Sequence, residues 1–169
     1  MAKNVRSVPI GEIIASDAPN DVLVAYGLGS CVAVCLYDPV AQVGGLLHAL
    51  LPTSTGNVFS DNGRKPTPAR FVDQGTPMLI ESLVELGAQR SRMIARLCGG
   101  ARVLSALDIV DFLNIGERNV QAAENTLRAE GIPVQAQATG GGIGRTVRLY
   151  MADGQVTVKS LARGEQVLQ

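Results

Sequence analysis

The sequence predicts an α+β domain that is dominated by strands and carries two substantial helices. Short runs rich in β-branched residues alternate with glycine and proline turns, and two longer segments have apolar residues at helical spacing. No linker, internal repeat or low-complexity stretch divides the 169 residues, a length that gives one domain a sizeable core. We therefore expect a single domain over residues 1–169, with its core between about 8 and 160.

The first third of the chain predicts three neighbouring strands. Residues 22–26 and 32–37 are short β-branched segments, and residues 27–31 between them form a tight, glycine-rich connection. A turn at Asp38-Pro39 leads into a third strand at residues 43–51. Because these strands are almost continuously apolar, we expect a sheet that is covered on both faces.

The middle of the chain predicts a long loop followed by a helix. Residues 53–70 are polar and rich in glycine and proline, and a loop of this length in a compact domain tends to be functional or mobile. Residues 71–86 have apolar side chains near helical spacing and end at Gly87. Pro77 leaves two alternatives: the helix begins near Thr76 with the proline in its first turn, or the helix is kinked.

The second half of the chain predicts a strand, a helix and then three strands. Asn114 and Glu117 have the spacing of a capping box, and the helix that follows should stop at Gly131. Its apolar face would carry Val120, Ala123 and Leu127. The strands are expected at residues 92–97, 134–138, 145–151 and 155–160, the last two joined by a hairpin turn at Asp153-Gly154.

Composition argues against several classes of partner. Lys+Arg and Asp+Glu each number 15, so the chain has no electrostatic footprint for a nucleic acid or an anionic membrane. No segment approaches the ~20 apolar residues of a membrane helix, and the N-terminus lacks the features of a signal peptide. An odd number of cysteines, three, predicts reduced thiols in the cytoplasm.

Cys31 and His48 are the candidate catalytic residues. Cys31 follows a glycine-rich turn at the start of a strand, and the glycines let backbone N–H groups approach a substrate and form an oxyanion pocket. His48 is the only histidine, so any chemistry that needs an imidazole near neutral pH must use it. From pattern alone, a structural role for either residue remains the alternative.

Three other sites are less favoured. We expect no zinc site on Cys31, Cys35 and His48, because residues four apart on a strand lie ~13 Å apart. Ser30 does not match the nucleophile elbow of hydrolases, which requires glycine where Val32 stands. The glycines of residues 139–145 precede a strand rather than a helix, which favours a loop over a nucleotide site.

Taken together, these residues resemble the CheD family, the chemoreceptor glutamine deamidases of bacterial and archaeal chemotaxis. The resemblance spans residues 10–160, and the 17-residue separation of Cys31 from His48 is part of it. The matching segments are Gly27-Leu-Gly-Ser-Cys-Val-Ala-Val34, Tyr37-Asp-Pro39, Gly44-Gly-Leu-Leu-His48, Leu51-Pro52, Gly99-Gly-Ala101, Ile115-Gly-Glu-Arg-Asn119 and Thr139-Gly-Gly141.

The resemblance implies a fold and a site. The fold would be a layered α+β structure, with a sandwich-like core of mixed and antiparallel strands and helices packed outside, similar to toxin-type cysteine deamidases. The site would be Cys31 as nucleophile and His48 as base, with N–H groups around Gly29 and Ser30 for the oxyanion. The family's third member is a threonine where this chain has Ala25, so a main-chain carbonyl there would have to orient the imidazole.

The implied activity is hydrolysis of glutamine side chains to glutamate on methyl-accepting chemotaxis receptors, through a thioester and without metal or cofactor. The first alternative is a weakened regulatory module that binds a CheC-type phosphatase. The second is a receptor methylesterase, because the same pair of residues could attack an ester.

Overall fold

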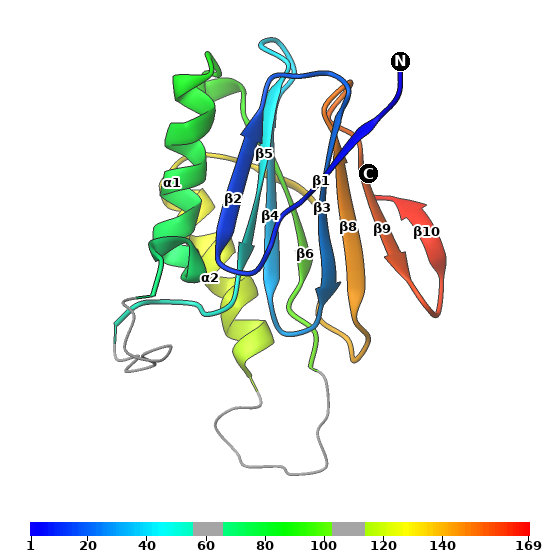
Figure 1. Ribbon diagram of the computed structural model, residues 1–169. Coiled ribbons are helices and arrows are strands. Elements are labelled where there is room, and N and C mark those ends of the chain that lie inside the picture. The colour runs from blue at the N-terminus through cyan, green and yellow to red at the C-terminus, as the bar shows by residue number, and fades with distance from the viewer. Residues whose placement is uncertain (56–65, 103–113) are drawn as a thin grey trace.

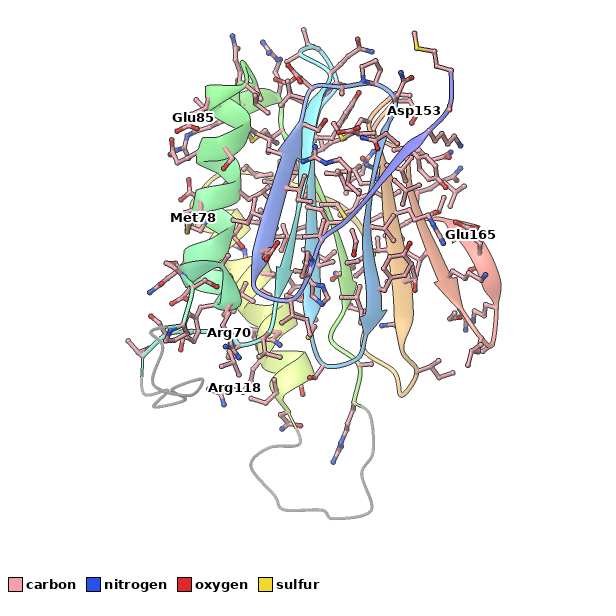
Figure 2. The ribbon with its side chains drawn as sticks, viewed as in Figure 1. Arg70, Met78, Glu85, Arg118, Asp153 and Glu165 are labelled. Carbon is pink, nitrogen blue, oxygen red and sulfur yellow. The ribbon has the colours of Figure 1, made fainter. Side chains whose placement is uncertain are left out.

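The computed structural model describes residues 1–55, 66–102 and 114–169, which form two five-stranded sheets and two α-helices. The sheets face each other, and both helices lie on the outer side of one sheet (Figure 1). Met78 and Glu85 point outward from the first helix, whereas Glu165 lies on the last strand at the opposite edge of the molecule (Figure 2). The layered α+β fold expected from the sequence is confirmed.

The first sheet has the strand order β1-β3-β8-β9-β10. Its first pair, β1 and β3, is parallel and the other pairs are antiparallel. The strands are β1 (Asn4–Ser7), β3 (Asp21–Leu28), β8 (Arg145–Tyr150), β9 (Val156–Ser160) and β10 (Gly164–Val167).

The second sheet has the strand order β2-β5-β4-β6-β7, with β6 and β7 parallel and the rest antiparallel. Its outer face carries the helices. The strands are β2 (Glu12–Ser16), β5 (Val43–Ala49), β4 (Val32–Asp38), β6 (Ile94–Gly99) and β7 (Val134–Thr139). The helices are α1 (Val72–Glu85) and α2 (Ile115–Ala129), with short 3-10 turns at Pro68–Arg70 and Arg90–Arg92.

Two apolar layers hold the three structural layers together. One fills the space between the second sheet and the helices, where Val34 and Leu47 meet Leu79. The other fills the space between the sheets, where Ala33 and Leu149 lie. Strand β4 is buried along its whole length because alternate side chains enter the two layers, and this explains its continuous apolar sequence.

Most predicted elements are confirmed, with three differences. Helix α1 begins at Val72, so Pro77 lies inside the helix and the start near Thr76 was wrong. Asn114 is the N-cap of α2, but its side chain makes no capping hydrogen bond, so the predicted capping box does not form. Strands β1, β2 and β10 were not predicted. Part of the expected long loop, residues 56–65, lies outside the described residues.

Candidate active site

Cys31 lies in the connection that crosses from one sheet to the other. Strand β3 ends at Leu28 in the first sheet and β4 begins at Val32 in the second, so residues 29–31 join the two layers. Gly27 lies in β3 where the pairing with β8 shifts register between Ala25 and Leu28, and its φ of +63° is one that glycine adopts readily. The Cys31 side chain is 7% exposed and belongs to the apolar layer between the sheets.

His48 lies near the end of β5, with its side chain 3% exposed. Its Nδ1 is 3.0 Å from the carbonyl oxygen of Val8. Because a carbonyl can only accept, this contact assigns the ring proton to Nδ1 and leaves Nε2 as the basic nitrogen. Among the described residues, the buried Nε2 has no hydrogen-bond partner.

The carbonyl that meets the imidazole corrects the sequence-based expectation. We expected the main chain of Ala25 to orient the ring, but the acceptor is Val8, which follows β1 in the first sheet. Ala25 lies in β3, fully buried and paired with Val147. The Val8 N–H donates to the carbonyl of Val24 at 2.8 Å, so the neighbouring strand holds the new acceptor in place.

Cys31 and His48 lie on one face of the β4–β5 pair. His48 is directly opposite Ala33, and Cys31 precedes Ala33 by two residues on the same face. Such diagonal neighbours have Cα atoms roughly 7–8 Å apart. The structure therefore brings the two side chains together as neighbours, although no hydrogen bond joins the thiol to the ring in the part of the chain described.

Hydrogen bonds from the segment that follows β6 fix the backbone around Cys31. The N–H of Gly100 donates to the Cys31 carbonyl at 2.7 Å, and the N–H of Ala101 donates to the Gly29 carbonyl at 2.8 Å. These bonds point both carbonyls toward the segment that follows β6. Within the described residues, the N–H groups of residues 29–31 donate to no other group of the protein.

Asn119 of α2 completes this arrangement. Its Nδ2 donates to the carbonyl of Ser30 at 2.8 Å and to the carbonyl of Leu50 at 2.9 Å. The sequence analysis quoted Asn119 within a matching segment but assigned it no role, although a signal for one was present. Asn119 is four residues before Ala123 and eight before Leu127, so it lies on the helix face that was predicted to be apolar.

Two glycines allow the close packing around the site. Gly99 has φ of +100°, and a Cβ there would be 2.2 Å from the Cys31 carbonyl oxygen. A Cβ at Gly116 would be 2.6 Å from the Gly100 carbonyl oxygen. Any larger side chain would therefore displace either the backbone at Cys31 or the first turn of α2.

Electrostatics leave the resting pair uncharged. Burial raises the pKa of the Cys31 thiol, and the N–H of Cys31 itself only partly offsets that effect. Burial lowers the pKa of His48, partly offset by its hydrogen bond to the Val8 carbonyl. A neutral thiol therefore faces a neutral imidazole near pH 7, so the thiolate expected for an activated cysteine is not preformed.

The remaining candidates are separate from this pair. Cys35 and Cys98 are buried between the sheets, where burial raises the pKa of Cys35 well above its ordinary value and that of Cys98 to about 12. In the described part of the chain, no three His, Cys, Asp or Glu side chains are grouped so as to hold a metal ion. No described helix is long and apolar enough to cross a membrane.

Fold and site together define a three-layer α+β protein in which a cysteine and the chain's only histidine share one face of a strand pair between two sheets. The family model described as CheD chemotactic sensory transduction matches residues 50–160. The chain belongs to the CheD family.

Several curated relatives match almost the whole chain. One from Symbiobacterium thermophilum, "Probable chemoreceptor glutamine deamidase CheD", is 40% identical over 98% of both chains. A protein of the same name from Caldanaerobacter subterraneus is 42% identical over 97% of this chain and 98% of its own. Another, from Pyrococcus horikoshii, is 41% identical over 88% of both chains. A solved structure, Bacillus licheniformis hypothetical protein YfiH, covers 81% of this chain and 61% of its own at 15% identity, with a TM-score of 0.43. That likeness is too weak to assign fold or function.

Proposed function

We propose that this protein hydrolyses glutamine side-chain amides to glutamate on methyl-accepting chemotaxis receptors, with Cys31 as nucleophile and His48 as general base. One observation carries the proposal: the thiol and the basic Nε2 of the ring lie on the same face of one strand pair, beside backbone N–H groups that donate to no other residue in the described part of the chain. Thiol, imidazole, amide groups and water are sufficient for this chemistry.

The first half of the reaction forms a thioester. As Sγ of Cys31 attacks the amide carbon, Nε2 of His48 takes the thiol proton and the carbonyl oxygen becomes an oxyanion. The N–H groups of residues 29–31, which donate to no other residue among those described, would be the donors for this oxyanion. The carbon–nitrogen bond then breaks, and the imidazolium gives its proton to the nitrogen, which leaves as ammonia.

The second half releases glutamate. Water attacks the thioester carbon while Nε2 takes one of its protons. The carbon–sulfur bond then breaks, and the proton returns to the sulfur of Cys31. Throughout both halves the Val8 carbonyl holds Nδ1–H, so the same tautomer is restored after each proton transfer.

The neutral resting pair makes proton transfer part of the attack. Because burial disfavours both the thiolate and the imidazolium, charge separates only when a substrate supplies the oxyanion to be stabilised. The thiol and the ring must also approach to hydrogen-bonding distance at that stage, as catalytic contacts often do only in the substrate complex. Three free cysteines are consistent with action in the cytoplasm.

The decisive experiment measures ammonia released from a receptor fragment that carries glutamines. We expect release by the wild-type protein and a loss of at least about 10³-fold in Cys31→Ser and His48→Ala. Cys35→Ser is the matched control, because Cys35 lies on the same face of β4 but is buried more deeply than Cys31, at 2% against 7% exposed, and it should keep activity. Full activity in Cys31→Ser would refute the mechanism.

Mass spectrometry of the receptor fragment separates the alternatives. Deamidation and demethylation change the mass of the fragment differently, so a receptor methylesterase would be recognised at once. Binding of a CheC-type phosphatase by a folded protein that releases no ammonia would favour the regulatory module.

Alkylation tests the thiol without any substrate. Iodoacetamide should modify Cys31 before Cys35 and Cys98, because Cys31 is the most exposed of the three. Equal rates at all three residues would count against Cys31 as the accessible nucleophile.

A further inference from the structure

Asn119 is the one fully buried polar side chain of α2, and it contacts both halves of the candidate active site. The Ser30 carbonyl, 2.8 Å from Nδ2, belongs to the residue immediately before Cys31. The Leu50 carbonyl, 2.9 Å from the same nitrogen, lies two residues after His48. One amide nitrogen therefore joins the backbone beside the nucleophile to the backbone beside the base.

The bond to Ser30 also sets the direction of a donor. A peptide unit is planar and trans, so the carbonyl of Ser30 and the N–H of Cys31 point in opposite directions within one rigid plane. When Asn119 holds that carbonyl toward α2, the Cys31 N–H is turned to the other side. Among the described residues this N–H has no other acceptor in the protein, so it is available to an incoming oxyanion.

The choice of residue supports a geometric role. Only a primary amide offers two hydrogens on one short, planar group, and both are used here. In contrast, the Oδ1 of Asn119 is buried without a partner among the described residues, which is unfavourable for folding. An apolar residue of similar size would avoid that penalty but would leave the Ser30 and Leu50 carbonyls without this donor, so the amide at this position serves those two carbonyls.

We propose that Asn119 is a positioning residue, which orients the Cys31 N–H for the oxyanion and ties the end of β5 to the nucleophile connection. This inference rests on the proposed function. The anchoring is firm because Gly116, one turn earlier in α2, packs against the same Gly100 whose N–H binds the Cys31 carbonyl. Helix α2 thereby fixes the backbone on both sides of the Ser30–Cys31 peptide.

The test compares Asn119→Ala with Leu127→Ala in the full-length protein. Leu127 is equally buried on the same face of α2, but it is part of the apolar layer rather than of the site. We expect Asn119→Ala to lower kcat for ammonia release by about 10²-fold, with KM changed by less than about threefold, as for loss of an oxyanion donor. Leu127→Ala should lower the unfolding temperature and leave kcat within about twofold.

A second readout does not depend on activity. The Cys31 N–H favours the thiolate, so losing its orientation should move the pH profile of Cys31 alkylation to higher pH in Asn119→Ala and not in Leu127→Ala. If wild-type protein releases no ammonia, the proposed function fails, and this profile still tests the positioning role. An unchanged kcat together with an unchanged profile in folded Asn119→Ala would overturn the inference.

Folding is controlled with a second variant. Serine is smaller than asparagine and has one hydrogen-bond donor instead of two. Asn119→Ser is measured in the same way if Asn119→Ala does not fold. A lowered kcat in folded Asn119→Ser supports the positioning role. Failure of both variants to fold, while Leu127→Ala folds, would show that Asn119 is needed for the fold itself and would overturn the assignment.

Discussion

Replacing Gly99 by alanine should disturb the backbone at Cys31 by an amount that can be worked out from the structure. A Cβ at Gly99 would be 2.2 Å from the Cys31 carbonyl oxygen, and real Cβ contacts are essentially never under 3.0 Å. The atoms must therefore separate by at least 3.0 − 2.2 = 0.8 Å. A misplacement on the order of 1 Å costs roughly 10²-fold in rate, so we expect kcat/KM to fall by about that factor.

Gly87→Ala is the matched control for this substitution. Gly87 has φ of +101°, almost the same as the +100° of Gly99, but nothing lies within 4 Å of its Cβ position. Both variants should lose about 1–2 kcal/mol of unfolding free energy, because alanine is strained at a positive φ. Only Gly99→Ala should lose a further ~1 kcal/mol, because the hydrogen bond from Gly100 to Cys31 is displaced as well.

The assay combines thermal unfolding with ammonia release from a receptor fragment. For a domain of this length, 1 kcal/mol corresponds to about 2–4 °C in the unfolding temperature, so the two stability losses can be separated. Activity is measured well below both unfolding temperatures. If Gly99→Ala retained kcat/KM within about twofold of Gly87→Ala, the placement of the Cys31 carbonyl would not matter for catalysis and the reasoning would be refuted.

Three further predictions follow from the pKa values and the packing. Burial lowers the pKa of His48 from its ordinary value, so the fall of kcat/KM as the base gains a proton should be centred at a lower pH than an ordinary histidine would give. A fall centred at or above the ordinary pKa of histidine would contradict this. Although burial raises the pKa of Asp38, hydrogen bonds led by Arg92 hold this pKa well below its ordinary value. Arg92→Ala should therefore reduce the free energy of unfolding by about 2 kcal/mol at pH 7. The difference from wild type should shrink as pH falls below about 4, where the carboxylate gains a proton in the unfolded protein. The exposed Arg90, which pairs with Glu81 and Glu130, is the control, and Arg90→Ala should cost less than about 1 kcal/mol in the same denaturant titration. Ala25→Thr introduces the threonine that the resemblance to the family implies, but it overfills a buried position, so it should lower the free energy of unfolding by about 1–3 kcal/mol. It should raise kcat by no more than about twofold, because the Val8 carbonyl already holds Nδ1 of His48. A tenfold rise in kcat would show that the hydroxyl matters.

The most deeply buried strands were the easiest to predict from the sequence. Strands β4 and β5 are buried along their whole length, and their apolar runs identify them. Strands β1 and β10 are mostly exposed and four residues long, so they offer no periodic signal. Strand β2 contains Ile13 and Ile14, but it is short and lies at a sheet edge, where pairing rather than composition defines it.

The candidate site was predictable only in its side chains. Residue chemistry singled out Cys31 and His48, but their common face depends on the register that places Ala33 opposite His48. The Val8 carbonyl could not have been found, because every residue carries one and only the docking of the two sheets selects it. Asn119 was discoverable as a polar residue in an apolar stripe, yet its two acceptors come from connections far away in the chain.

The uncharged resting thiol has a consequence for survival under oxidative stress. Peroxide attacks thiolates far faster than thiols, and reactive cysteines are usually vulnerable for that reason. In the resting protein Cys31 is protonated and almost enclosed, so its sulfur offers peroxide little to attack. A signalling enzyme built in this way would keep its nucleophile intact while idle, and its exposure to damage would be confined to turnover.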